Sequence, residues 1–304
     1  MSALALPPAM RLFERGWLSA NNLLLQDGAQ NVLIDSGYLS HAPQTLALLA
    51  HALEGQSLDL IVNTHLHSDH CGGNAALQAR YGAGTLIAAS EADKVRQWDM
   101  DALSYRATGQ QCAPFHFDDV LRPGEVRRWA GIDWQILAAP GHDAHALMLY
   151  APQERVLVSG DALWQNGLGV LFPELAGEDG FGPARATLEQ ISRLDVRIVI
   201  PGHGAAFADV DEAIARAQQK LDALEVSAEK HAWHALRVLL KFLLLERQQI
   251  ALDQLGQTLH GIPLFASVNQ RVLQLDAQTL AQQVVAQLER AGAARVEHGV
   301  LWNV

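Results

Sequence analysis

The sequence is poor in cysteine, with only Cys71 and Cys112 among its 304 residues. Two cysteines cannot build the disulfide framework of a small secreted domain, and their scarcity is typical of proteins in a reducing compartment. Residues 1–16 have neither a basic start nor a sustained apolar stretch before a small-residue cleavage site, so no signal peptide is expected. These absences predict a cytoplasmic protein.

Long apolar runs and an excess of positive charge are also absent from the sequence. Residues 238–245 form an apolar run that Lys241 interrupts, and such a run is too short to span a bilayer. The 22 lysines and arginines against 33 aspartates and glutamates give a formal net charge of -11. This acidity disfavours a nucleic-acid partner without excluding one, because binding to phosphate backbones requires positive charge. We expect a small-molecule substrate and no membrane anchor.

The remaining composition is that of a globular chain, since 49% of the residues are hydrophobic. Apolar runs of strand length alternate with helical patterns in the first part of the chain, which predicts a mixed α/β region. The predicted elements are a hairpin within 20–37, strands at 58–64, 85–89, 133–138, 146–150, 155–159 and 196–200, and helices at 44–53, 74–80 and 185–194. Later, long helical patterns end in a hairpin around His298 and Gly299. We therefore predict one domain over 1–208 and a smaller, mainly helical, winged-helix-like domain over 209–304.

Residues 64–73, THLHSDHCGG, concentrate metal-binding side chains directly after a predicted strand. His65 and His67 lie two residues apart on an extended segment, so their side chains project to the same side and can bind one cation. Asp69 and His70 follow where the chain begins to turn, and joining them to the same ion would strain the backbone. The turn is therefore predicted to supply half of each of two metal sites.

Each half-site needs further ligands from distant parts of the chain. Three candidates, each beside a glycine and each after a predicted strand, are His142, Asp161 and His203. Histidine and carboxylate side chains on loops at strand ends are what a rigid scaffold needs to present a metal site.

The ordered set HxHxDH, followed by a distant His, Asp and His, resembles the metallo-β-lactamase fold superfamily of metallohydrolases, and in particular its glyoxalase II-like (hydroxyacylglutathione hydrolase-like) members. The resemblance implies a four-layer αββα sandwich of two sheets with helices on both outer faces. It implies a structural role for Asp35, at the end of the predicted hairpin, in supporting the ligand loop. The implied ligands, with Asp161 bridging the two metals, are His65, His67 and His142 for the first and Asp69, His70 and His203 for the second.

Two adjacent divalent ions can share a bridging water and lower its pKa, which makes hydroxide available near neutral pH. We therefore expect a binuclear hydrolase in which a metal-bound hydroxide attacks a small thioester or ester. Asp69 or Asp161 would orient the attacking water or accept a proton. Ligation by histidine and carboxylate without thiolate favours zinc, with iron and manganese as alternatives.

Other activities within the superfamily are alternatives to thioester hydrolysis. They are those of the lactonases, of endoribonucleases and related phosphodiesterases with a winged-helix-like C-terminal module, and of a mononuclear iron dioxygenase that acts on persulfides. The region after Gly204 has eleven acidic and nine basic residues, which disfavours a ribonuclease. The same region shows no set of lysines and arginines suited to the carboxylates of glutathione, which leaves the thioester undefined.

Two further alternatives are weaker. β-Lactam hydrolysis is disfavoured because the thiolate ligand of zinc β-lactamases corresponds here to Asp161. A winged-helix regulator with a metal-sensing domain is disfavoured because a pure binding module does not need an open binuclear site.

Several other residues receive an interpretation of their own. His145 is interpreted as a hydrogen-bonding support rather than a ligand. His231 and His234 are interpreted as part of a polar helix face. Cys71 is interpreted as a small residue packed under the ligand loop.

Two loops, residues 97–118 and 164–183, are expected to line the substrate side, because both are longer than plain connectors. The apolar faces of the C-terminal helices are expected to pack against the metal domain or a second subunit in a homo-oligomer. The helix around Trp233 is expected near the mouth of the site, where it would shape what can enter.

Overall fold

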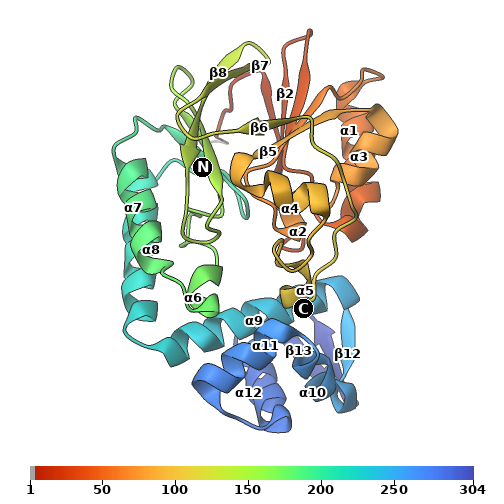
Figure 1. Cartoon of the computed structure of the whole chain (residues 1–304), viewed down its shortest axis with the longest axis vertical. Helices are drawn as coiled ribbons and strands as arrows, with labels where there is room; N and C mark the ends of the chain where they lie inside the picture. Colours follow the sequence, from red (N-terminus) through yellow and green to blue (C-terminus); the bar gives the residue numbers. More distant parts are fainter. Residues whose placement is uncertain (1–3) are drawn as a thin grey trace. The chain divides into compact units, whose positions relative to one another are not determined.

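The computed structural model describes residues 4–304 and consists of two compact units (Figure 1). The first unit contains the chain up to Leu103 and Gln111–Lys220, and the second contains Ser104–Gln110 and Leu221–Val304. This division differs from the predicted boundary at residue 209, because the helix that begins at Val210 continues past Lys220. Nothing in the sequence pattern predicts that residues 104–110 belong to the second unit.

Two β-sheets form the centre of the first unit. Among the described residues, the first sheet has six strands in the order β1-β2-β3-β4-β5-β6, and the second has five in the order β11-β10-β9-β8-β7. The strands of the first sheet are β1 (Met10–Phe13), β2 (Asn22–Gln26), β3 (Asn31–Ile34), β4 (Leu60–Val62), β5 (Gly84–Ala88) and β6 (Asp119–Leu121). Those of the second are β7 (Val126–Trp129), β8 (Ile132–Ala138), β9 (Leu147–Ala151), β10 (Val156–Gly160) and β11 (Ile198–Pro201). The predicted hairpin is β2 and β3, which pair antiparallel.

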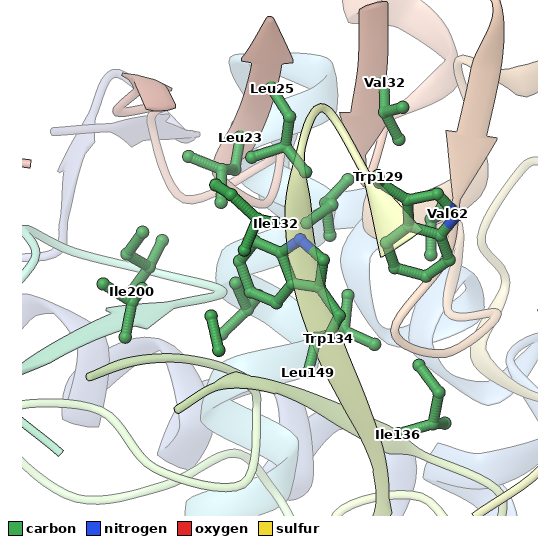
Figure 2. Packing of buried hydrophobic residues seen from close by; sticks show 14 of the residues in the cluster. Leu23, Leu25, Val32, Val62, Trp129, Ile132, Trp134, Ile136, Leu149 and Ile200 are labelled. Atoms are coloured by element: carbon green, nitrogen blue, oxygen red, sulfur yellow. The ribbon is translucent and has the colours of Figure 1, made fainter. Parts of the chain in front are cut away.

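The two sheets share one hydrophobic core. Alternate residues of β8, namely Ile132, Trp134 and Ile136, belong to this core, and Trp134 is fully buried in it (Figure 2). Leu23 and Leu25 of β2 contribute from the other sheet (Figure 2). This alternation follows from the pleat, which points successive side chains to opposite faces of a sheet. Close packing at the core fixes the relative positions of the strand ends.

Helices cover both outer faces, which confirms the predicted four-layer αββα sandwich. Leu24 and Leu33 of the first sheet point away from the shared core and pack with Leu49 of α1 (Ala42–Leu53) and Leu77 of α3 (Asn74–Tyr81). Beside the second sheet lies α7 (Phe181–Ser192), the predicted helix at 185–194 (Figure 1). The other helices that begin in this unit are η1 (Leu39–His41), α2 (Ser68–Cys71), η2 (Ala89–Glu91), α4 (Ala92–Gln97), α6 (Phe172–Ala176) and α8 (Val210–Glu225).

Every strand predicted in the first unit is present within a few residues of its expected bounds. The three strands that the sequence pattern missed, β1, β6 and β7, all lie at sheet edges. In β7 only Trp129 is buried, and β6 is three residues long with one buried residue, Leu121. Because an edge strand pairs on one side only and buries few side chains, it lacks the apolar periodicity by which a strand is recognised.

The second unit combines helices with a small sheet of order β12-β14-β13. Its elements are α5 (Tyr105–Thr108), α9 (Ala228–Arg247), β12 (Gln249–Ala251), α10 (Leu252–His260), α11 (Pro263–Val268), η3 (Asn269–Leu273), α12 (Ala277–Arg290), β13 (Ala294–Glu297) and β14 (Val300–Asn303). The predicted C-terminal hairpin is β13 and β14, and it turns at His298 and Gly299, both with positive φ. The winged-helix interpretation of this order stays a prediction. Within residues 4–304, the length and apolar character of a membrane span occur together in none of the helices.

Lys241, on α9, forms hydrogen bonds with the residue that precedes β13, with β14 and with Val304. Its Nζ donates to Asn303 Oδ1 at 2.7 Å, to the carbonyl of Ala293 at 2.8 Å and to the carbonyl of Val304 at 2.9 Å. Burial lowers the pKa of the Lys241 ammonium. The three carbonyl and amide oxygens therefore replace the water that burial removes.

Replacing Lys241 by Met should destabilise the second unit, because the substitution keeps the aliphatic stem and removes three hydrogen bonds. We expect the free energy of unfolding to fall by about 1–3 kcal/mol, measured by urea denaturation followed by far-ultraviolet circular dichroism. The matched control is Lys230→Met, an exposed position on the same helix. Equal stability of the two variants would contradict this account of the contact.

Candidate metal centre

Seven histidine and aspartate side chains from distant parts of the first unit meet at the ends of strands from both sheets. They form two groups, and within each group one donor atom per residue lies within 4.8 Å of the others. All seven side chains are buried. The groups are His65, His67 and His142, and Asp69, His70, Asp161 and His203. The structure thus brings together all seven residues that the sequence predicts as ligands.

The first ligand-rich segment begins where β4 ends. The chain stays extended as far as His67 and then forms the single helical turn α2, which carries Asp69 and His70. The following Gly72 lies against other backbone, because a Cβ there would approach two backbone atoms to 2.5 Å. Gly72 and Gly73 therefore have no room for a side chain, and larger residues there would push the turn away from the backbone of Ser36 and Leu39.

The ligands from the second sheet arrive on neighbouring strands. β10 and β11 are parallel, so their C-terminal ends deliver Asp161 and His203 to the same edge. A Cβ at Gly202 would lie 2.1 Å from Asp161 Oδ1, and one at Gly169 would lie 2.3 Å from His142 Nδ1. Both glycines leave space into which a ligand side chain extends.

In the first group, three ring nitrogens converge. His65 Nε2 lies 3.1 Å from His67 Nδ1, and that atom lies 2.7 Å from His142 Nε2. Around a tetrahedral ion with bonds of about 2.0 Å, the ligand atoms would be roughly 3.3 Å apart. The two observed distances, 3.1 and 2.7 Å, are shorter, so the rings would move apart slightly around an ion. The arrangement therefore fits three ligands of one cation.

The second group has a buried nitrogen that lacks a hydrogen bond. His70 Nε2 has no hydrogen-bond partner among the described residues, although it lies 3.4 Å from Asp161 Oδ1 and 3.8 Å from Asp69 Oδ2. His203 Nε2 lies 3.0 Å from the same Asp69 oxygen. A buried polar atom without a partner is costly, and a cation among these four side chains would remove the cost.

Asp161 faces both groups. Its Oδ1 is directed toward His70 of the second group, and its Oδ2 lies 3.4 Å from His142 Nε2 of the first. This is the position that the resemblance implies for a bridging carboxylate.

Neighbouring oxygens fix the orientation of two candidate ligands. Asp35 Oδ2 lies 2.7 Å from His70 Nδ1, and the same carboxylate accepts hydrogen bonds from the amide and hydroxyl of Thr64 at 2.9 and 2.8 Å. The carbonyl of Val170 lies 2.6 Å from His142 Nδ1. A proton on each Nδ1 leaves Nε2 of both rings free to bind a metal. The resemblance implies the part played by Asp35, whereas no sequence signal indicated Val170.

Burial and mutual proximity set the charges in the centre. Burial, followed by the charge of a neighbouring imidazole, lowers the pKa of His142 to about 4 and also lowers that of His65. These rings are therefore neutral near pH 7, in the form that binds metals. Although burial lowers it, the pKa of His70 is raised well above its usual value by Asp35 and Asp161. Although burial raises it, the pKa of Asp161 is held well below its usual value by the surrounding histidines.

Aromatic side chains surround the second group. Trp164 Nε1 donates to Asp161 Oδ1 at 3.2 Å. Trp17 stacks on His203 with ring centroids 5.2 Å apart and planes 4° apart, and its edge contact with Trp164 has a centroid distance of 5.3 Å. Phe172 contacts His67 of the first group at 4.9 Å. Trp164 and Phe172 come from residues 164–183, predicted as a loop, in which the structure forms α6 and the first turn of α7. This segment lies against the candidate ligands, and its contact with a substrate stays a prediction.

The loop between β1 and β2 holds the His203 segment in place. Asn21 Nδ2 donates to the carbonyls of Pro201 at 2.9 Å and Gly204 at 2.7 Å, on either side of His203. The amide of Ala20 donates to the carbonyl of Asp69 at 3.0 Å. The loop therefore contacts segments that carry ligands from both sheets. No sequence signal indicated this role.

The remaining interpreted residues lie outside both groups. His145 Nε2 lies 3.4 Å from Glu91 Oε1, in agreement with its exclusion from the ligands. Cys71 is buried under the turn as expected. The interpretation of His231 as part of a polar helix face is wrong, because this residue is 5% exposed. On α9 it lies four residues before the buried Ala235, so helical spacing places it on the apolar stripe.

Comparisons with known proteins agree with this geometry. Residues 15–203 match the family described as "Metallo-beta-lactamase superfamily". A hydroxyacylglutathione hydrolase of Brucella anthropi is 24% identical over 216 residues, which are 66% of this chain and 72% of the relative. Another, of Synechococcus sp., is 35% identical over 118 residues, but the match covers only 39% of this chain and 40% of the relative. The crystal structure of a metallo-β-lactamase family protein of Thermus thermophilus, 23% identical, covers 99% of this chain and 100% of its own with a TM-score of 0.59, which shows the fold.

Replacing Trp164 by Phe should weaken metal binding, because Asp161 Oδ1 loses its indole donor while the ring contact with Trp17 can persist. We expect the Kd of the more weakly held metal to rise roughly tenfold, which is the lower end of the range of affinity losses for residues that orient ligands. Competition with a chromophoric chelator measures this Kd. The control is Trp17→Phe, which retains an aromatic ring beside His203 and leaves the indole donor to Asp161 in place. If Trp164→Phe binds both metals as tightly as the parent, the indole does not orient the carboxylate.

Proposed function

Because the chain belongs to the metallo-β-lactamase superfamily, we propose that it is a binuclear metal-dependent hydrolase of a small thioester or ester. The observation that carries the proposal is the carboxylate of Asp161. Its two oxygens lie 3.4 Å from His142 Nε2 and 3.4 Å from His70 Nε2, which belong to different groups. A carboxylate in this position is suited to bridging two cations, and a pair of cations suits hydrolysis.

The ligand atoms fit two divalent cations. Five imidazoles and two carboxylates without a thiolate favour zinc, with iron and manganese as alternatives. When bound, such a pair lowers the pKa of a shared water and polarises the substrate oxygen. A mononuclear centre would hold a single ion at the first group, with Asp161 as the nearest carboxylate. It would leave His70 Nε2 buried without a partner, and this favours the binuclear interpretation.

Two carboxylates are suited to handling the proton of the attacking water. Against burial, which raises it, His70 and His203 lower the pKa of Asp69. Both Asp69 and Asp161 are therefore ionised at neutral pH and can accept a hydrogen bond or a proton. Both oxygens of Asp161 face candidate ligands, whereas Asp69 uses Oδ2 toward His203 and His70. We therefore assign bridging to Asp161 and proton transfer to the Asp69 carboxylate through its other oxygen, Oδ1.

The aromatic residues support a substrate with an apolar part next to the bond that is cleaved. Trp17 is 49% exposed although it lies beside a candidate ligand, and Trp164 and Phe172 complete an apolar surface around the donors. A thioester presents a weakly solvated sulfur and an acyl chain, which such a surface accommodates. The similarity to hydroxyacylglutathione hydrolases favours a thioester, and the identity of its thiol part is left open.

Metal analysis tests the binuclear centre directly. Carefully loaded protein should contain about two ions per chain, since the donors form two incomplete spheres joined by one carboxylate. His142→Ala and Asp69→Ala should each lower the metal content by about one ion per chain under the same loading. His145→Ala, whose ring faces Glu91, is the control and should retain the parent metal content. A single ion at saturation in the parent protein would reject the binuclear centre.

Activity assays with the loaded protein test the substrate class. Across a panel of thioesters, oxygen esters, lactones, phosphodiesters and RNA, we expect the highest kcat/KM for a thioester with an apolar acyl group. Asp69→Asn should lower kcat by roughly 10²–10⁴-fold, the range for loss of a general base. Measuring the metal content of the same samples separates loss of the base from loss of metal. Preferential cleavage of RNA or a phosphodiester would reject the thioester assignment.

A further inference from the structure

The two cysteines of the chain meet beneath the candidate metal-binding turn. Cys71 Sγ and Cys112 Sγ are 3.8 Å apart although the residues are 41 positions apart in the sequence. Both cysteines are unbridged, and both belong to the first unit. A disulfide bond would require the sulfurs to approach by about 1.8 Å, since bonded sulfurs lie about 2.0 Å apart.

The two sulfurs differ in their surroundings. Cys71 is the last residue of α2 and is fully buried, with its Sγ 3.3 Å from the carbonyl of His67 and 3.4 Å from that of Leu66. Cys112 is 8% exposed and lies in a segment, residues 110–117, that forms neither helix nor strand. A small oxidant therefore reaches Cys112 first, while Cys71 lies behind it.

The backbone on the Cys71 side is firmly held. The carbonyl of His70 accepts a hydrogen bond from the amide of Ser36 at 2.7 Å and another from Asn63 Nδ2 at 3.2 Å. On the other side, Cys112 Sγ lies 3.7 Å from the carbonyl of its own neighbour, Ala113. Its segment is held at Gln111, whose amide donates to Tyr38 Oη at 3.0 Å, and at His116, whose amide donates to Gln78 Oε1 at 3.2 Å. The approach that a bond needs is therefore assigned to residues 112–115 between these contacts and to rotation of the two cysteine side chains.

We propose that Cys71 and Cys112 are a peroxide-oxidised pair whose intrachain disulfide fastens residues 110–117 to the metal-binding turn. In the first step hydrogen peroxide oxidises the Cys112 thiol to a sulfenic acid and is itself reduced to water. In the second, the Cys71 sulfur attacks the sulfenic sulfur. The S–S bond forms, the S–O bond breaks, and the departing hydroxide takes the thiol proton as water. Two thiols and one peroxide thus give one disulfide and two waters.

The disulfide has a consequence for metal retention. Cys71 directly follows His70, and the bond would close the chain between residues 71 and 112 into a covalent loop. Release of a metal requires the turn to open, and a covalent tether reduces the freedom gained by opening. Metal release should therefore be slower in the oxidised protein. This consequence rests on metal binding in the proposed function and is independent of the substrate.

The first experiment maps the bond in the full-length, metal-loaded protein. After treatment with hydrogen peroxide, alkylation and digestion without reductant, we expect a cross-linked peptide pair containing Cys71 and Cys112 in monomeric protein, reversed by dithiothreitol. Cys112→Ser and Cys71→Ala should each abolish the pair. Thermal unfolding of both variants checks that they are folded. Independent sulfinic acids at the two positions, or dimers linked through Cys112, would overturn the proposal.

The second experiment measures the rate at which a chelator removes zinc from oxidised and reduced protein. We expect release to be roughly threefold slower, or more, after oxidation, and Cys112→Ser should show no difference between the two treatments. Equal rates in protein that carries the mapped disulfide would reject the effect on metal retention. Failure of the reduced protein to bind zinc would instead count against the proposed metal centre, and the peptide mapping would still decide the cysteine pair.

Discussion

One electrostatic constraint governs this structure: five imidazoles and two carboxylates lie close together where water is largely excluded. Nitrogens such as His67 Nδ1 and His142 Nε2, 2.7 Å apart, approach more closely than two lone pairs tolerate unless a proton or a cation lies between them. Buried ionised groups are also costly unless an opposite charge compensates them. Cations bound among these side chains would satisfy both requirements. The binding energy of the metals would then contribute to the stability of this end of the sandwich.

The sandwich supplies the rigidity that such a cluster needs. The core around Trp134 fixes the two sheets to each other, and the ligands follow directly from the ends of their strands. Further contacts remove the remaining freedom. Asn21, in the loop between β1 and β2, holds the segment of His203 from the second sheet, and Asp35 orients His70. Asp35 itself has a φ of 57°, so its backbone adopts a conformation that is uncommon for a residue other than glycine. An unfavourable conformation at this position is consistent with a side chain that must reach the ligand loop.

The sequence allowed the mixed α/β class and the seven candidate ligands to be predicted from local patterns, whereas the four-layer arrangement and the division of the ligands between two metals were implied by the family resemblance. Apolar runs mark central strands. Four candidates lie in the segment after one such run, and the other three stand beside glycines after later runs. Side chains such as Trp17, Asn21 and Val170 could not be found in this way, since each contacts a ligand segment that lies far away in the sequence. These contacts depend on the tertiary structure, and no local sequence pattern indicates them. The edge strands were missed for a related reason, as their residues alternate too weakly between buried and exposed.

This difference separates two kinds of residue in the site. The ligands follow strand ends and form the pattern that carries the superfamily resemblance, whereas Trp17 and Trp164 come from loops, where a substitution need not disturb the sheets. The two kinds are nevertheless joined, because Trp164 donates to Asp161 Oδ1 and also contacts the exposed Trp17. A group that shifts Trp17 would act on the Asp161 carboxylate through the ring contact with Trp164 and the indole hydrogen bond. In the proposed function, substrate recognition and the position of Asp161 are therefore coupled.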